Sequence, residues 1–201
     1  MGLRESKKQE TRREIADTAM RLFVERGFDH VTVAEVAAAA RVSEKTVFNY
    51  FPTKEDLFFD EVPEREAQLA AAIGDRKPGE SFVAALHRLQ AVQTGRLSSP
   101  GFAIFARVID ESPALQAKEL EVMAGMTATL AAAIREELGA DELDAKVAAN
   151  MLVSVHWQLF QNARAQALAG RHGPAAARRL RADLDRAYRL LEHGLRLLEA
   201  T

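Results

Sequence analysis

The run RVSEKTVFNYFPTK, from Arg41 to Lys54, holds side chains that could recognise nucleobases. In the major groove of DNA a lysine can donate hydrogen bonds to guanine, an asparagine can pair with adenine, and an aromatic edge can pack on the thymine methyl group. Lys45, Asn49 and Phe48 supply one residue of each kind. Base recognition in DNA is therefore the first chemistry that these residue types indicate.

These side chains share one face if the run is helical. Ser43 predicts the N-cap of a short helix, and Pro52 predicts its end. With Val47 taken as the buried direction, a step of 100° per residue turns four side chains toward solvent. They are Lys45, Thr46, Phe48 and Asn49. The predicted helix therefore presents a narrow ridge, on an element that fits the major groove.

Other cations near this run predict contacts with the DNA backbone. Lys54 begins the next predicted helix, where its charge opposes the helix dipole. Free amides and a lysine at one place favour an anion, so we predict that Lys54 binds a phosphate. Thr32, at the start of an earlier helix, predicts a similar contact. The segment from Arg4 to Arg13 has five cations and two glutamates, a local surplus of +3.

The overall charge does not require a nucleic-acid partner. Residues 1–60 hold ten Lys and Arg and eleven Asp and Glu, which gives a formal charge of -1. The whole chain carries -2, with a pI near 6.2. Solvated helices carry scattered charges of this kind, and a sequence-blind polyanion binder is usually strongly basic. Any positive charge that meets DNA must therefore be local.

The surrounding elements are predicted to be helices. Capping boxes predict helix starts at Ser6, Thr32 and Thr53, and Gly27 predicts the end of the first helix. Pro63 predicts a kink or break in the fourth helix. Longer helices are predicted near 80–95, 101–111, 114–138, 141–169 and 175–199. With no strand alternation in the sequence, the fold class is all-α, with about nine helices in total.

Composition excludes several classes. The hydrophobic share of 48%, with few Tyr, Trp, Gly and Pro, favours helices. The lack of cysteine excludes disulfides, thiol catalysis and Cys-ligated zinc. No apolar run approaches the roughly 18 to 20 residues that span a bilayer, so a soluble cytoplasmic protein is expected. Gly2 fits the loose myristoylation consensus, but Ser6 is better explained as a helix cap.

Catalytic motifs are missing from the sequence. It has no nucleophile elbow, HExxH motif, Gly-rich phosphate loop or acidic cluster with metal spacing. The five histidines, at 30, 87, 156, 172 and 193, are widely spread, with no pair at i, i+4. The sequence therefore predicts that the protein is not an enzyme and has no catalytic residue, cofactor or metal site.

The run from Phe23 to Phe58 resembles the N-terminal domain of the TetR family of bacterial transcriptional repressors. The matching landmarks are the Gly27-Phe28 turn, Thr32, the VAAAARVS turn and the TVFNYFPTKEDL helix. The resemblance implies a homodimer that binds a palindromic DNA operator. It also implies that a small-molecule effector, held in the C-terminal domain, releases the protein from DNA.

By position, the resemblance implies a set of DNA-contacting residues. These are Thr32, Lys45, Thr46, Phe48, Asn49, Tyr50 and Lys54, with Glu44 as a further candidate. Many relatives have Tyr where Phe48 stands and His where Tyr50 stands. Phe48 has no hydroxyl for a phosphate, but it keeps an apolar edge for a base.

The resemblance divides the chain into two domains. Residues 1–58 are a helix-turn-helix DNA-binding domain, and residues 59–201 are a larger helical domain for ligand binding and dimerisation. The apolar stripes of the helices at 141–169 and 175–199 predict a four-helix bundle with a second subunit. The alternative is that both stripes are wholly internal.

Aromatic, methionine and scattered polar residues predict an effector pocket. The candidates are Phe82, Leu86, Phe102, Phe105, Arg107, Met123, Met126, Asn150, His156, Trp157 and Phe160. Each can equally be ordinary core or surface. Arg107 lies in an apolar segment, where a buried cation would require an anionic partner. The function indicated is a ligand-responsive transcriptional regulator, and the alternative is a small-molecule binding or carrier protein without a specific operator.

Overall fold

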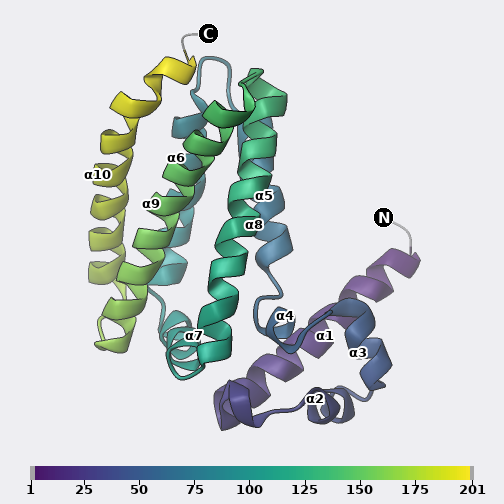
Figure 1. Cartoon of the computed structure of the whole chain (residues 1–201). Coiled ribbons are helices and arrows are strands. Elements are labelled where there is room, and N and C mark those ends of the chain that lie inside the picture. The colour runs from purple at the N-terminus through teal and green to yellow at the C-terminus, as the bar shows by residue number, and fades with distance from the viewer. Residues whose placement is uncertain (1–2, 200–201) are drawn as a thin grey trace. The chain divides into compact units, whose positions relative to one another are not determined.

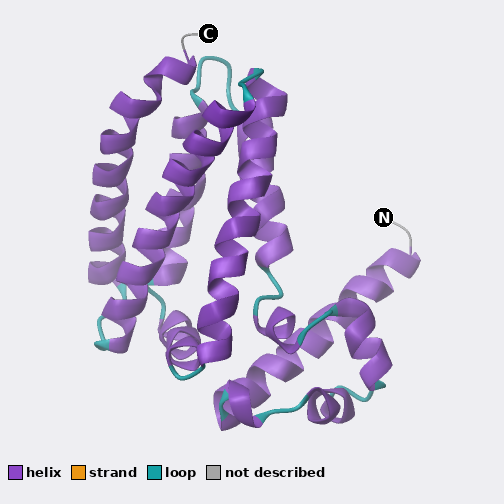
Figure 2. Ribbon diagram, viewed as in Figure 1, coloured by secondary structure: helices purple, strands orange, loops and turns teal. Residues whose placement is uncertain are grey.

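The structure of this chain is a computed structural model that describes residues 3–199, with the side chains of residues 6–192. Within that range all regular structure is helical, and Figure 2 shows helices and loops without strands. The elements, labelled in Figure 1, are α1 (Leu3–Arg26), η1 (Phe28–His30), α2 (Val33–Ala39), α3 (Glu44–Tyr50), α4 (Lys54–Phe58), α5 (Val62–Gly74), α6 (Phe82–Leu97), α7 (Pro100–Asp110), α8 (Pro113–Leu138), α9 (Glu142–Leu168) and α10 (Pro174–Glu199). The prediction of an all-α fold is confirmed.

Side-chain caps start the short helices, as predicted. The Thr32 hydroxyl accepts a hydrogen bond from the Glu35 amide at 3.2 Å, and the Ser43 hydroxyl accepts one from the Thr46 amide at 3.0 Å. Thr53 forms a capping box in the same way at the start of α4. The prediction for Ser6 was wrong, because α1 begins at Leu3. Good helix formers precede Ser6 and extend the helix past it, and Gly2 lies outside the described residues.

Two turns in the first sixty residues require unusual backbone conformations. Gly27 ends α1 with a φ of 82°, a conformation that a residue without Cβ adopts without strain. Between α2 and α3, the Val42 amide donates to the Ala37 carbonyl at 2.9 Å. This bond closes a Schellman turn, whose left-handed position is usually glycine. Arg41 occupies that position here with a φ of 57°.

The described residues contain ten α-helices, one more than predicted. The reason is a break in the predicted fourth helix, where α4 ends at Phe58 and α5 begins at Val62. Pro63 therefore lies in the first turn of α5, where its missing N–H breaks no helical hydrogen bond.

The chain divides into two compact units. The first consists of Met1–Val62 together with Arg107–Glu119. Its core is rich in phenylalanine, and the ring centroid of Phe28 lies 4.8 Å from that of Phe23 and 6.3 Å from that of Phe58. These contacts join α1, η1 and α4 and give the short helices a rigid base.

The second unit consists of Pro63–Ala106 and Leu120–Thr201. Five helices, α5, α6, α8, α9 and α10, supply its hydrophobic core, and α6, α9 and α10 pack on one another (Figure 1). Its most buried large residues include Ile73, Phe82, Leu86, Leu130, Ile134, Leu152 and Leu184. In the described part of the chain, no helix combines the length and the apolar character that crossing a membrane requires.

Candidate nucleic-acid interface

The exposed face of α3 has the arrangement predicted from its periodicity. Val47, on the inner side, is only 1% exposed. Lys45 and Asn49 are exposed, Phe48 is 47% exposed, and Thr46 is half-buried. We call Lys45, Thr46, Phe48 and Asn49 the recognition face. The predicted exposure is confirmed for Lys45, Phe48 and Asn49, and Thr46 is only partly exposed.

Most side chains of the recognition face have no internal partner. Among the described residues, Lys45 and Asn49 form no side-chain hydrogen bond or ion pair, so their donors are available to a ligand. Thr46 differs, because its hydroxyl lies 2.8 Å from that of Ser43 and takes part in the cap of α3. Glu44 is exposed and Tyr50 is half-buried beside this face.

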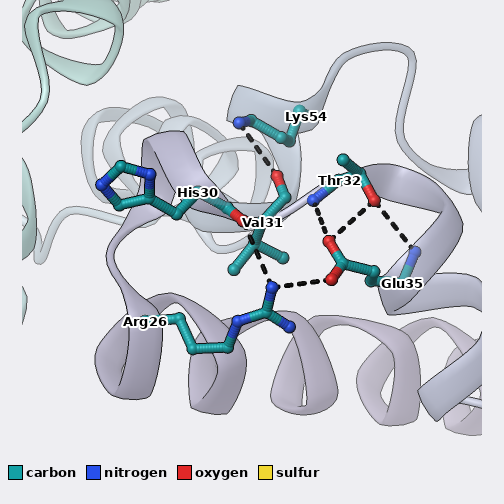
Figure 3. Close-up of polar contacts among 6 residues, drawn as sticks. All are labelled: Arg26, His30, Val31, Thr32, Glu35 and Lys54. Carbon is teal, nitrogen blue, oxygen red and sulfur yellow. Dashed lines mark hydrogen bonds and ion pairs between the residues drawn. The ribbon is translucent and has the colours of Figure 1, made fainter.

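Lys54, predicted to bind a phosphate, is half-buried and forms hydrogen bonds within the protein. Its ammonium donates to the carbonyl oxygens of Phe28 at 3.0 Å and Val31 at 3.1 Å, and the second bond is drawn in Figure 3. The same nitrogen lies 4.1 Å from the centroid of the Phe28 ring. Lys54 therefore joins the first turn of α4 to the turn between α1 and α2.

Thr32 is held in a similar way. Its amide and its hydroxyl both donate to Glu35 Oε2, each at 2.8 Å, and the Arg26 guanidinium donates to Glu35 Oε1 at 2.6 Å (Figure 3). These bonds, chiefly that of the Thr32 amide, lower the pKa of Glu35 to about 2. Arg26 also donates to the carbonyl of His30 at 3.4 Å. We call Arg26, residues 28–32, Glu35 and Lys54 the corner.

Within the first unit, the segment 107–119 makes two polar contacts with residues of the N-terminal part. Ser112 donates to Asp29 at 2.8 Å, and the Lys118 ammonium lies 3.1 Å from an Asp56 oxygen. Burial raises the pKa of Asp56, but hydrogen bonds from Thr53 and Lys118 outweigh it, so the pKa lies below its ordinary value. Both contacts join residues far apart in the sequence, and no local motif points to them.

The N-terminal cations have different environments. Arg12 donates to the carbonyl of Asp60 at 2.7 Å, and its guanidinium lies 4.8 Å from the centre of the Phe51 ring. Lys7, Lys8 and Arg13 are exposed, and the side chain of Arg4 lies outside the described residues. The local surplus of +3 therefore includes at least one cation that supports the fold.

Residues 15–60 match the profile described as "Bacterial regulatory proteins, tetR family". The transcriptional regulator TcmR of Streptomyces glaucescens is 29% identical over 148 residues, which cover 70% of this chain and 66% of TcmR. The regulator LuxR of Vibrio harveyi is 45% identical over 51 residues, 25% of this chain and 24% of LuxR. The chain thus spans just under two thirds of TcmR and about a quarter of LuxR.

A solved structure extends the likeness along the chain. NalD of Pseudomonas aeruginosa, the secondary repressor of the MexAB-OprM multidrug efflux pump, matches with a TM-score of 0.60 and 18% identity, covering 90% of this chain and 96% of NalD. Residues 15–60 therefore carry the N-terminal helix-turn-helix domain of the TetR family, in which α2 and α3 form the motif, and the chain as a whole shares the fold of a TetR-family structure.

Eight of the predicted pocket residues form two groups in the second unit. Phe82, Leu86, Met123 and Met126 belong to or pack against the hydrophobic core. Phe102, Phe105, Trp157 and Phe160 form an aromatic group from α7 and α9. Ring centroids within this group lie 5.5 Å apart for Phe102 and Phe160 and 6.2 Å apart for Trp157 and Phe160.

Two polar candidates do not lie in a buried site. Arg107 is exposed and belongs to the first unit, because the helical turn directs Ala106 and Ile109 inward and Arg107 outward. Arg107 is therefore a surface residue and does not require a buried anionic partner. Asn150 is also exposed, and its amide donates to the carbonyl of Lys146 on the same helix at 2.8 Å.

The second unit also contains His156 and a polar pocket. Burial, and secondarily the charge of Arg65, lower the pKa of His156 to about 4, although part of its surface reaches solvent. A pocket of about 470 Å³ opens between α9 and α10. It is lined by Asn162, Gln166, Arg171, Arg179, Ala182 and Asp183. These residues could not be recognised from the sequence, because scattered polar residues on two helices and the loop between them form no motif.

Proposed function

We propose that this chain is a ligand-responsive repressor that binds a palindromic operator as a homodimer and is released by a small-molecule effector. The observation that carries the proposal is the recognition face of α3. Among the described residues, Lys45 and Asn49 present donors without internal partners, and Phe48 presents an apolar edge beside them. These are the groups that distinguish base pairs in the major groove.

The contacts have separate roles. Lys45 donates to guanine, Asn49 pairs with adenine, and the Phe48 ring packs on a thymine methyl group. Thr46, Tyr50 and Glu44 lie on α3 beside these three and complete the contact set. By position in the family motif the set would also include Thr32 and Lys54, but the donors of both are engaged in the corner.

The surface of α9 supports the homodimer. Its exposed and half-buried residues include a series with alternating steps of four and three, the spacing of a coiled-coil seam. The series is Leu143, Val147, Asn150, Ser154, Trp157, Gln161, Arg164 and Leu168. Leu143 is 70% exposed and Leu168 is 43% exposed at its two ends, and Leu190 of α10 is 75% exposed. Burial of such residues against a second copy would stabilise a dimer.

Antiparallel pairing of α9 with its copy sets a definite register. Leu143 would face Leu168 of the partner subunit, and Asn150 would face the partner's Gln161. Leu143→Lys or Leu168→Glu alone should then weaken dimerisation about tenfold or more, because each buries a charge without a partner. The double variant should recover much of the loss through two ion pairs across the twofold axis. Sedimentation velocity measures this, and a double variant no better than the worse single variant would refute the register.

The aromatic group of the second unit is the proposed effector site. Apolar walls with a few polar groups are typical of small-molecule sites, and His156 adjoins Trp157 in the sequence. Trp157 is the only tryptophan of the chain, so its fluorescence reports on this place directly. An effector that releases the operator should also change this fluorescence.

Selection of bound sequences from a random DNA pool tests the proposal as a whole. Two half-sites about 34 to 36 Å apart, one duplex turn or a multiple of it, should be enriched as an inverted repeat. Binding should weaken steeply with salt. A pool that shows no enrichment, together with small-molecule binding detected by Trp157, would favour a carrier protein over a repressor.

A further inference from the structure

Lys54 has a different environment from the other lysine near the proposed DNA contacts. It is half-buried, whereas Lys45 is exposed and has no internal partner among the described residues. We propose that Lys54 is a positioning residue, which holds the carbonyl end of η1 and so places the N-terminus of α2, and that it does not bind an operator phosphate. The DNA-binding part of this inference rests on the proposed function.

The contacts of Lys54 use most of its ammonium group. An ammonium has three donors, and two of them are engaged by the carbonyls of Phe28 and Val31 at 3.0 and 3.1 Å. The Phe28 ring, 4.1 Å from the nitrogen, is a favourable neighbour for a cation. A phosphate would have to replace these contacts. The free energy lost with them would offset much of the free energy gained by binding the phosphate.

The carbonyls of Phe28 and Val31 lie in the segment that leads directly into the N-terminus of α2. Val31 immediately precedes Thr32, the N-cap of α2, and η1 is only three residues long. Arg26 holds the intervening carbonyl of His30 as well as Glu35. Lys54 from α4 and Arg26 from α1 therefore both donate hydrogen bonds to the carbonyls of residues 28–31 (Figure 3). Without the ammonium, the carbonyls of Phe28 and Val31 lose a charged donor, and the start of α2 loosens.

A pair of matched variants separates positioning from phosphate binding. Lys54→Met and Lys45→Met remove the same charge and leave an apolar side chain of similar length. Operator affinity is measured for both over a range of salt concentrations, at a temperature at which circular dichroism shows each variant folded. Thermal unfolding is recorded in parallel.

The expected results differ for the two positions. Lys54→Met should lower the melting temperature by roughly 4 to 8 °C and weaken operator binding about tenfold, with an unchanged salt slope. Lys45→Met should leave the melting temperature unchanged and relax base preference at one position of each half-site, because Lys45 contacts a base. Lys54→Arg, which can donate to both carbonyls and stack on Phe28, should restore most of the affinity.

Amide hydrogen exchange shows whether α2 itself is affected. The Val36 amide makes the first hydrogen bond of α2, to the Thr32 carbonyl at 3.2 Å, and the Val47 amide makes that of α3, to the Ser43 carbonyl at 3.1 Å. In Lys54→Met the exchange of Val36 should accelerate at least tenfold, while that of Val47 stays within about twofold of wild type.

Three other results would contradict either the positioning role of Lys54 or the proposed function. If Lys54→Met lowers the salt slope by about 1 and leaves Val36 protected, Lys54 binds phosphate and the inference is wrong. If the wild type enriches no DNA sequence, the proposed function fails, but the exchange of Val36 still decides whether Lys54 holds α2. A Lys54→Met variant that does not fold leaves Lys54→Arg, in which loss of Val36 protection would refute the inference.

Discussion

The recognition face and the corner contain the same residue types and use them in opposite ways. Lys45 is exposed and has no partner in the part of the chain that the structure describes, whereas Lys54 donates to two backbone carbonyls. Phe48 is 47% exposed, whereas Phe28 is 2% exposed and packs on Phe23. The comparison shows that burial and bonding partners, rather than residue type or place in a motif, separate a side chain available to DNA from one that supports the fold.

The difference has a physical reason. A donor already bonded inside the protein must give up that bond before it binds DNA, so only the difference between the two bonds adds to affinity.

Phenylalanine truncation compares the two regions directly. Phe28→Ala should lower the free energy of unfolding by roughly 3 to 5 kcal/mol, because it leaves a cavity beside Phe23 and Phe58. Phe48→Ala should change it by less than about 0.5 kcal/mol and should weaken operator binding instead. Urea unfolding and DNA titration measure the two effects. Equal losses of stability would show that Phe48 also supports the fold.

Asn49→Ala should change base preference without changing stability. Loss of the amide should remove about 1 to 3 kcal/mol of discrimination at one position of each half-site, because adenine loses its paired contact. A competition assay with operators altered at single positions measures this. Uniform weakening across all those operators would assign Asn49 to the backbone rather than to a base.

Mild acid should weaken the second unit while the corner keeps its charges. The folded-state pKa of His156 is about 4, below its ordinary value of 6.5, so the unfolded chain binds the proton more readily. The contribution of His156 to stability is complete above pH 6.5 and is lost as the pH falls toward 4. Between pH 7 and 5.5 the loss should be about 1 kcal/mol.

His156→Gln is the control for this pH dependence, and urea unfolding at both pH values measures it. Between pH 7 and 5.5 the variant should not show the decrease in the free energy of unfolding that His156 causes in wild type. Glu35, with a pKa of about 2, stays ionised throughout, so the corner should not respond. The same loss in the variant and in wild type would exclude His156 as its source.

Arg41→Gly should have the smallest effect and the opposite sign. Arg41 has a φ of 57°, which glycine adopts without strain, so the variant should be more stable by about 0.5 to 1 kcal/mol. Thermal unfolding measures the change. A less stable variant would show that the Arg41 side chain contributes contacts that outweigh the backbone strain.

Local features of the fold were predictable because they depend on nearby residues. The caps at Thr32, Ser43 and Thr53 lie where the sequence places them, since each bond spans only three positions. Ser6 misled because strong helix formers precede it and α1 starts earlier. The position of Arg107 followed its helical phase, which the apolar neighbours alone did not reveal.

Of the candidate site, only the recognition face was predictable from the sequence, and the contacts of the corner were not. The exposure of Lys45 and Asn49 follows from the period of a helix whose inner side is marked by Val47. The partners of Lys54 lie 26 and 23 positions away, and Lys118 reaches Asp56 from a later helix. No pattern of neighbouring residues predicts contacts over such separations.

The sequence by itself determined that this chain is helical, where its short helices start, and which side of α3 faces solvent. Only the tertiary structure decided that Lys54 and Thr32 are bound within the corner and that the segment 107–119 joins the first unit. The reason is that periodicity and capping act over a few residues, whereas the partner of a buried donor depends on which distant segments the core brings together.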